Sequence, residues 1–262
     1  MATQLDPSAA TRFRQALGLW AAFFTLNVIL NGTIPFILGA DLHAWTSSAA
    51  KAILSPLLIY GILFLVVPLI LAKGIPTVRQ PAFLFPLLLA VVAISLWFVL
   101  RGIGAVAIVM LAYLHWRFGL GELGFRSRGR RGDLIAIILP GLLAAEAGVL
   151  QAGGWSPEPG KALLSALDRL FANPASSVEN LFYFGFVAEK LSWKAGRWLT
   201  PLLIALMYTA HEMSNPEYWY EGMSFGFVFV GVVLITALYL WRRNVVAIWL
   251  GDGLRWFLTG LI

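Results

Sequence analysis

Cysteine is absent from this chain of 262 residues. Its absence excludes disulfide bonds, cysteine-ligated metals and thiol catalysis, so any hydrolytic chemistry must use carboxylate, histidine or serine side chains, or a metal. Charge is also scarce, because Asp, Glu, Lys and Arg together make up 12% of the residues, against roughly 25% in soluble globular domains. Together with a mean hydropathy of +0.80, this scarcity excludes a soluble globule.

The chain contains long apolar runs between its few charged residues. Counted against the roughly 20 residues that a helix needs to cross the hydrocarbon core, they predict an all-α, polytopic membrane helical bundle with about nine transmembrane helices, eight being the alternative. The shortest runs favour helices that are tilted, re-entrant or longer than their apolar parts. The predicted spans are 15–40, 52–72, 82–100, 102–116, 134–152, 176–190, 198–212, 223–241 and 245–262.

The basic residues predict how the chain is oriented in the membrane, because the cytoplasmic segments of membrane proteins are rich in Lys and Arg. With the N-terminus in the cytoplasm, 14 of the 19 Lys and Arg residues fall in inner segments. This pattern predicts an integral protein of the bacterial inner (plasma) membrane, in contact with membrane lipid. It also explains the net charge of +6 without a nucleic-acid partner. The inner basic residues are Arg12, Arg14, Lys73, Arg79, Arg117, Arg126, Arg128, Arg130, Arg131, Lys190, Lys194, Arg197, Arg242 and Arg243.

A basic, glycine-containing segment divides the chain. Residues 117–133 are predicted to form a cytoplasmic linker. The linker separates the N-terminal membrane spans, residues 1–116, from a membrane core, residues 134–262. Most of the unusual polar residues fall in that core.

The predicted outer loop after the fifth span has a helical pattern of its own. Apolar residues recur there at helical spacing, while Lys161, Asp168 and Arg169 fall on the other face. This pattern predicts an amphipathic helix that lies in the membrane interface.

Glu179 is the first of three ionisable residues in the last predicted spans. A charged side chain inside lipid costs about 2.5–3.5 kcal/mol on insertion scales unless it faces a partner or water. Gly185, further along the same span, permits the close approach of a neighbouring helix. Two interpretations of Glu179 stay equally open: a poorly solvated and more basic general base, or a carboxylic acid hydrogen-bonded to a neighbouring helix or placed at the headgroups.

His211 and Asp252 are the other two ionisable residues. An imidazole coordinates metals, shuttles protons or orients water, although a single His at a helix end is more often a satisfied polar contact. Asp252 lies between two glycines, and Arg255 shares its helical face, so an internal ion pair is its simplest interpretation. Alternating helices place Glu179 and His211 at a similar depth near the outer side, and Asp252 matches that depth less well.

The order of these residues resembles the CPBP family of intramembrane proteases, the CAAX-prenyl and bacteriocin-processing enzymes also called Abi. The family carries Glu-Glu-x-x-x-Arg on one span, Phe-x-x-x-His on the next and His-x-x-x-Asn on a later one. Glu179 matches the first glutamate and His211 matches the histidine of the second motif. Leu-Gly-Phe at 123–125 resembles the family's lead-in to its core, and the resemblance covers roughly residues 117–262.

Several motif positions differ from the family pattern. The family's second glutamate, its arginine, its phenylalanine, its third-motif histidine and its asparagine are all replaced. The residues at these positions are, in that order, Asn180, Phe184, Met207, Asp252 and Trp256.

The resemblance implies an intramembrane endopeptidase of the CPBP type. In it, Glu179 acts as the base that activates a water molecule, while His211 and Asp252 position the water or a divalent metal such as Zn²⁺. The need for a metal stays open. A peptide or membrane protein is the implied substrate, and the outer depth of Glu179 and His211 favours exported or lipid-attached peptides.

Two alternatives remain open from the sequence. A catalytically inactive CPBP-like scaffold or regulator would keep the fold and bind a partner membrane protein, which the altered motifs and the many Trp and Phe residues favour. A transporter or channel would use Glu146, Glu179 and Asp252 as a proton or cation path, although the sequence contains no detectable inverted repeat.

Overall fold

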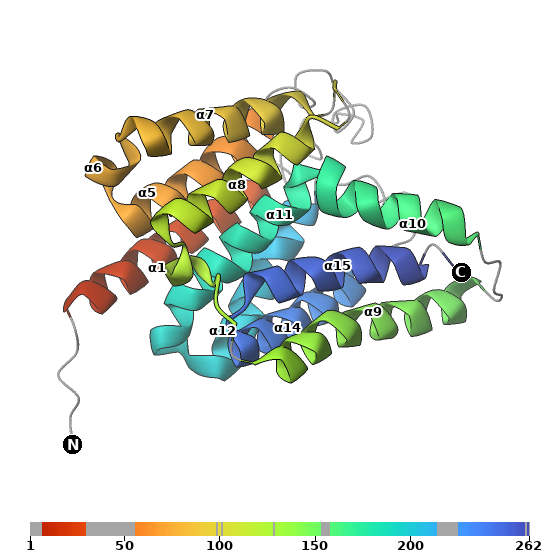
Figure 1. The fold of residues 1–262 in the computed structure, drawn as a ribbon. Coiled ribbons are helices and arrows are strands. Elements are labelled where there is room, and N and C mark those ends of the chain that lie inside the picture. Colours follow the sequence, from red (N-terminus) through yellow and green to blue (C-terminus); the bar gives the residue numbers. More distant parts are fainter. Residues whose placement is uncertain are drawn as a thin grey trace. The chain divides into compact units, whose positions relative to one another are not determined.

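The computed structural model describes residues 7–29, 56–97, 99–100, 102–127, 129–152, 158–213, 225–259 and 261. This part of the chain is all-helical apart from an isolated antiparallel bridge between Phe125 and Asn244 (Figure 1), so the all-α prediction is confirmed. The elements are α1 (Pro7–Asn27), η2 (Pro56–Val66), α5 (Val67–Lys73), α6 (Ile75–Val78), α7 (Pro81–Leu96), α8 (Gly104–Phe118), η3 (Gly121–Leu123), α9 (Arg130–Ala152), α10 (Pro159–Leu167), η4 (Asp168–Ala172), α11 (Pro174–Asn180), η5 (Leu181–Ala188), α12 (Glu189–Glu212), α14 (Phe225–Arg242) and α15 (Val245–Thr259).

These elements form two compact units that are discontinuous in sequence. The first unit contains α1, α12 and α14. The second contains η2, α5 to α11 and α15, and the boundary falls within η5, between Gly185 and Phe186. The predicted linker, residues 117–133, lies inside the second unit.

The helices fall on the predicted apolar stretches. Among the described residues, one helix, Pro56–Lys73, is long and apolar enough to cross a membrane, and Pro81–Leu96, Gly104–Phe118 and Val228–Arg242 are shorter apolar helices. The later part of the first predicted span lies outside the described residues. The count of nine transmembrane helices therefore stays a prediction.

Gly196 interrupts α12 between two of the predicted spans. Its backbone angles, φ 70° and ψ −177°, are not helical. A positive φ is strained for residues with a Cβ atom, and glycine adopts it without that penalty. The break falls between the predicted spans 176–190 and 198–212.

Aromatic stacking and a close backbone approach pack the second unit. The rings of Phe64 in η2 and Phe182 in η5 stack with centroids 4.3 Å apart. A Cβ atom on Gly185 would collide with the carbonyl oxygen of Leu123. The predicted close approach to Gly185 is therefore confirmed, and it fixes η5 against η3.

The predicted amphipathic helix is present as α10 and η4, and its place in the membrane interface stays a prediction. Ala162 and Ala166 are buried, whereas Leu164 is 68% exposed. The side chain of Arg169 is only 19% exposed and lies against two carboxylates. Helical periodicity placed Arg169 on the face opposite the apolar residues, but periodicity does not specify which face a neighbouring element covers.

A buried polar clamp joins the start of α9 to the start of α15. Asp133 accepts hydrogen bonds from Arg242 Nε at 3.1 Å, Asn244 Nδ2 at 3.0 Å and Ser127 Oγ at 2.6 Å. Burial alone would raise the pKa of the Asp133 carboxyl, but these three donors and the charge of Arg242 outweigh burial and hold the pKa below its usual value of 3.8. The clamp therefore favours an ionised Asp133.

Candidate functional site

The candidate site begins where α11 starts. The Asn173 side chain accepts a hydrogen bond from the backbone N–H of Ala175 at 3.0 Å, and Pro174 occupies the first helical turn, where no N–H is needed. The helix that this cap starts carries Ser176 and Glu179, three residues apart and on the same side. Both side chains are buried.

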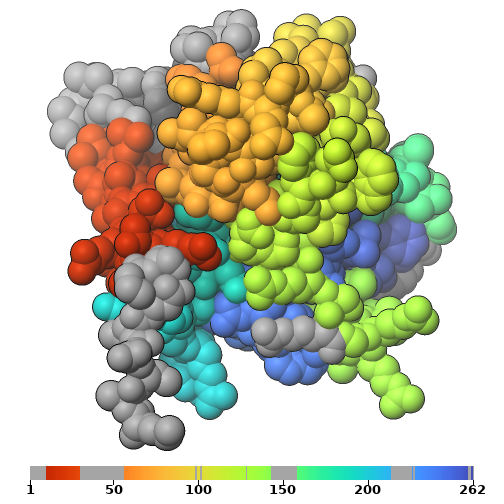
Figure 2. Space-filling view, turned by 60° about the vertical axis from the view of Figure 1, so that its left-hand side comes forward, coloured from red at the N-terminus to blue at the C-terminus, as the bar shows by residue number. Residues whose placement is uncertain are grey.

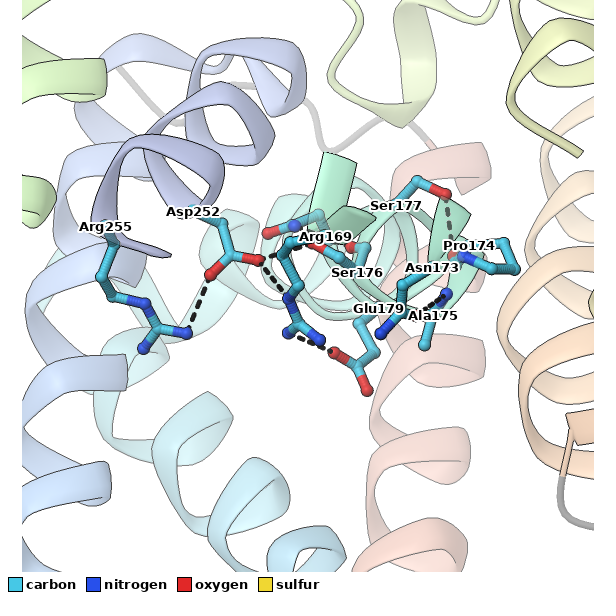
Figure 3. A network of polar contacts seen from close by, with 10 residues as sticks. Arg169, Asn173, Pro174, Ala175, Ser176, Ser177, Glu179, Asp252 and Arg255 are labelled. Carbon is cyan, nitrogen blue, oxygen red and sulfur yellow. Dashed lines mark hydrogen bonds and ion pairs between the residues drawn. The ribbon is translucent and has the colours of Figure 1, made fainter. Parts of the chain in front are cut away.

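Arg169 of η4 lies between Glu179 and Asp252 of α15 (Figure 3). Its Nε donates a hydrogen bond to Asp252 Oδ2 at 3.0 Å, and its Nη2 is 3.8 Å from Glu179 Oε2. The first distance is that of a hydrogen bond between charged groups, and the second is that of an ion pair without a hydrogen bond. One guanidinium group thus links two of the three predicted site residues.

Asp252 binds two further donors. Ser176 Oγ donates to its Oδ2 at 2.6 Å, and Arg255 Nη2 is 2.9 Å from its Oδ1. The pair with Arg255 confirms the ion pair predicted from the spacing. Arg169 and Arg255 supply two positive charges and Glu179 and Asp252 two negative charges, so the formal charges cancel, as buried charges require.

Two glycines allow α15 to bring Asp252 to its partners. A Cβ atom on Gly253 would lie 2.5 Å from the side chain of Leu170, and one on Gly251 would lie 3.1 Å from the carbonyl oxygen of Ala136. A larger residue at Gly253 would require the Leu170 side chain or α15 to shift. The Gly-Asp-Gly sequence is therefore explained by close packing on both sides of the carboxylate.

Trp256 lies beside the charged groups. Its ring centre is 5.6 Å from Cζ of Arg169 and 5.9 Å from Cζ of Arg255, distances at which a cation is attracted to an indole face. The family resemblance places a hydrogen-bonding asparagine at this position. In this protein the residue at that position is Trp256, and it lies next to the positive charges of Arg169 and Arg255.

The two carboxylates differ in their surroundings. Asp252 accepts from Arg169, Arg255 and Ser176 at 3.0 Å or less, which suits a carboxylate that anchors other side chains. Glu179 forms an ion pair with Arg169 at 3.8 Å, in addition to its other contacts. An ionised carboxylate accepts hydrogen bonds and protons, and this is the chemistry that a glutamate side chain supplies.

His211, the third predicted residue, belongs to the first compact unit, whereas Glu179 and Asp252 belong to the second. The imidazole is buried near the end of α12. Its ring centre is 5.8 Å from that of Phe23 in edge-to-face geometry and 6.5 Å from that of Tyr208. Within its own unit the imidazole therefore lies against aromatic rings, and its joint action with Glu179 stays a prediction.

The predicted divalent metal also stays a prediction. Among the side chains that the structure describes, no group of three or more His, Asp or Glu residues is arranged to hold a metal ion. Glu146 lies on α9, in a stretch whose side chains are not among those described.

Arg169 and Ser176 are site residues that the sequence analysis missed. Arg169 directly precedes the apolar residues Leu170 and Phe171, and a guanidinium at the edge of an apolar run needs a buried partner or water. That requirement was a usable signal for Arg169, since the carboxylate of Glu179 follows shortly after it in the sequence. Ser176 gives no comparable signal, because serine is common near helix starts.

Comparisons of the chain with protein-family models, with curated proteins and with solved structures find no match. The resemblance to CPBP proteases consequently stays a prediction based on Glu179, His211 and their sequence surroundings.

Proposed function

We propose that the protein is a polytopic integral membrane protein, located in the bacterial inner membrane with its N-terminus in the cytoplasm. The helix Pro56–Lys73 has a mean hydropathy of 2.2. On α7, the exposed fractions of Phe85, Leu88 and Val92 are 66%, 53% and 50%, and their spacing places them on one helix face. Exposed apolar surface costs about 25 cal/mol per Å² in water, and contact with lipid removes this cost.

We propose further that this membrane protein is a CPBP-type endopeptidase. The observation that supports the proposal is the position of Arg169 between Glu179 and Asp252. Phe184 replaces the arginine of the family's first motif, and Arg169 supplies a guanidinium beside the glutamate from another element. A glutamate with a basic partner is thus present, although the motif itself is altered.

In the proposed reaction, Glu179 accepts a proton from a water molecule while the water oxygen adds to the carbonyl carbon of the peptide bond. The C–N bond then breaks and the leaving nitrogen takes up a proton. Asp252 and Ser176 hold Arg169, and Arg169 orients Glu179 and balances its charge. His211 belongs to the other unit, and its part in the reaction stays a prediction from the sequence, as does that of a divalent metal.

The test compares the new protein N-termini formed in cells that express wild-type protein, Glu179→Gln or Glu158→Gln. Glu158 is the matched control, because its exposed carboxylate pairs with Lys161 outside the site. The proposal predicts expression-dependent N-termini with the wild type and Glu158→Gln, and their loss with Glu179→Gln at equal protein levels. The same N-termini in Glu179→Gln cells would refute the role of Glu179.

A catalytically inactive membrane scaffold or regulator is the second candidate. It is favoured by the engagement of Asp252 with Arg169, Arg255 and Ser176, since such a network stabilises a packed core without any reaction. This candidate predicts a membrane protein that co-purifies with the wild type and equally with Glu179→Ala and His211→Ala. Failure of all three proteins to retain a common partner would count against it.

A further inference from the structure

Five exposed arginines of the second unit stand on the turns and helix ends of its predicted inner side. None of them forms an ion pair within the described part of the chain, where every ion pair involves other basic residues. The five are Arg79, Arg117, Arg126, Arg130 and Arg131.

Hydrogen bonds bring these turns to one end of the unit. Lys73 at the end of α5 donates to the carbonyl oxygen of Phe118 at 3.0 Å, which joins the α5–α6 turn to the end of α8. Arg242 binds Asp133, and Val245 N–H donates to the carbonyl oxygen of Gly124 at 2.8 Å. Figure 2 shows α5 to α8, coloured orange to yellow-green, with the start of α9 on the same side of the molecule.

The acidic residues at this end are already balanced. Residues 73–81, 117–133 and 242–244 contain only two acidic residues, Glu122 and Asp133. Glu122 pairs with Lys73 at 2.7 Å and Asp133 pairs with Arg242 at 3.1 Å. The five exposed arginines therefore give this end a strong net positive charge.

Exposed apolar side chains adjoin the arginines in the sequence. Ile75 is 54% exposed, Trp116 is 79% exposed and Leu134 is 53% exposed. Trp116 directly precedes Arg117. An indole ring beside a guanidinium group is the combination found at the level of lipid headgroups, where one group contacts acyl chains and the other contacts phosphate.

We propose that this arginine cluster, Arg79, Arg117, Arg126, Arg130 and Arg131, binds the headgroups of anionic phospholipids at the cytoplasmic surface. The inference rests on the membrane location proposed above. The inference adds a preference for negatively charged lipid. Exposed apolar side chains alone would not create such a preference. A guanidinium group binds phosphate oxygens with two parallel hydrogen bonds, and the surrounding positive charge attracts further anionic headgroups.

The test measures binding of phosphatidylglycerol and of phosphatidylcholine to the full-length protein purified in detergent, by native mass spectrometry and by lipid-dependent thermal stabilisation. Two triple variants are compared, R126Q/R130Q/R131Q and R126K/R130K/R131K. The lysine variant keeps the charge and is the matched control. Inorganic phosphate is added in a parallel series to separate binding of a free anion from binding of a lipid.

The wild type should bind phosphatidylglycerol in preference to phosphatidylcholine, and added salt should weaken this preference. Each removed charge should weaken binding by about fivefold, so the glutamine variant, which lacks three charges, should lose roughly a hundredfold. The lysine variant loses only the paired hydrogen bonds of the guanidinium groups and should lose much less. Equal binding of both lipids, or equal binding by the glutamine variant and the wild type, would overturn the inference. Saturation by inorganic phosphate without lipid preference would also overturn it.

A carbonate wash of cell membranes separates this inference from the membrane location on which it rests. Protein that stays in the washed membranes but shows no lipid preference refutes only the inference. Protein released by the wash refutes the membrane location as well.

Discussion

Replacing Asp252 by Asn keeps the shape of the side chain and removes the charge that holds Arg169. The Asp252 and Arg169 side chains are only 15% and 19% exposed, and their hydrogen bond is 3.0 Å long. After the substitution, the remaining carboxylate near Arg169 is Glu179, at 3.8 Å. Breaking a buried ion pair on one side costs up to about 3–5 kcal/mol, because the other charge stays buried and loses its closest partner.

Arg255→Gln provides the contrast. Arg255 pairs with the same carboxylate at 2.9 Å, but its side chain is 37% exposed. Solvent screening limits such a pair to about 0–1 kcal/mol. Asp252→Asn removes both ion pairs of this carboxylate, whereas Arg255→Gln removes only the more exposed one. Asp252→Asn should therefore destabilise the protein several times more than Arg255→Gln does, and the difference reports the buried pair with Arg169.

Thermal unfolding of the protein in one detergent, followed by tryptophan fluorescence, measures the difference. With roughly 2–4 °C per kcal/mol for a chain of this size, Asp252→Asn should lower Tm by about 6–20 °C and Arg255→Gln by at most about 4 °C. Equal and small effects of the two substitutions would refute the burial argument. A variant with both Arg169→Met and Asp252→Leu should recover part of the lost stability, because the guanidinium of Arg169 is then no longer buried without its hydrogen-bond acceptor. The recovery is partial, since Glu179 and Arg255 each lose an ion-pair partner in this variant.

Three further predictions concern the packing and the polar clamp. Gly185→Ala should destabilise the protein by at least about 1–3 kcal/mol in an unfolding experiment, because the added Cβ overpacks a filled contact, whereas Gly231→Ala, with open space around it, should be neutral or stabilising. The pKa of Asp133 is lower in the folded state, so the ionised carboxylate stabilises the fold above the unfolded pKa of about 3.9, and this stabilisation is lost as pH falls through the folded pKa. Asp133→Asn should flatten the dependence of the unfolding free energy on pH in this range. An unchanged pH dependence would contradict the assignment. Lys73→Met should lower Tm, because it removes the donor to the end of α8 and leaves Glu122 without its ion pair; an unchanged Tm would show that this contact contributes little.

The sequence predicted the features that depend on local periodicity. Apolar runs predicted the helices, the three-residue spacing predicted the pair of Asp252 with Arg255, and Gly185 predicted a close approach that the contact with Leu123 confirms. Each of these features follows from the helical repeat or from the lack of a side chain. None of these predictions requires knowledge of the tertiary fold.

The central contact of the candidate site was not predicted, because it depends on the meeting of three elements. Arg169 lies on η4, Glu179 on α11 and Asp252 on α15. Helical periodicity placed Arg169 on a charged face and gave no information on which element covers that face. The three residues could have been connected only by requiring that each carboxylate within an apolar segment is paired with a cation.

The most direct test of the proposed endopeptidase uses water labelled with ¹⁸O. Membranes containing the protein are incubated in this water, and the newly formed C-terminal carboxylates are examined by mass spectrometry. Hydrolysis by an activated water predicts one ¹⁸O atom in each new carboxylate with the wild type and no labelled termini with Glu179→Gln. Equal labelling in membranes with the wild type, with Glu179→Gln and without the protein would contradict the proposal.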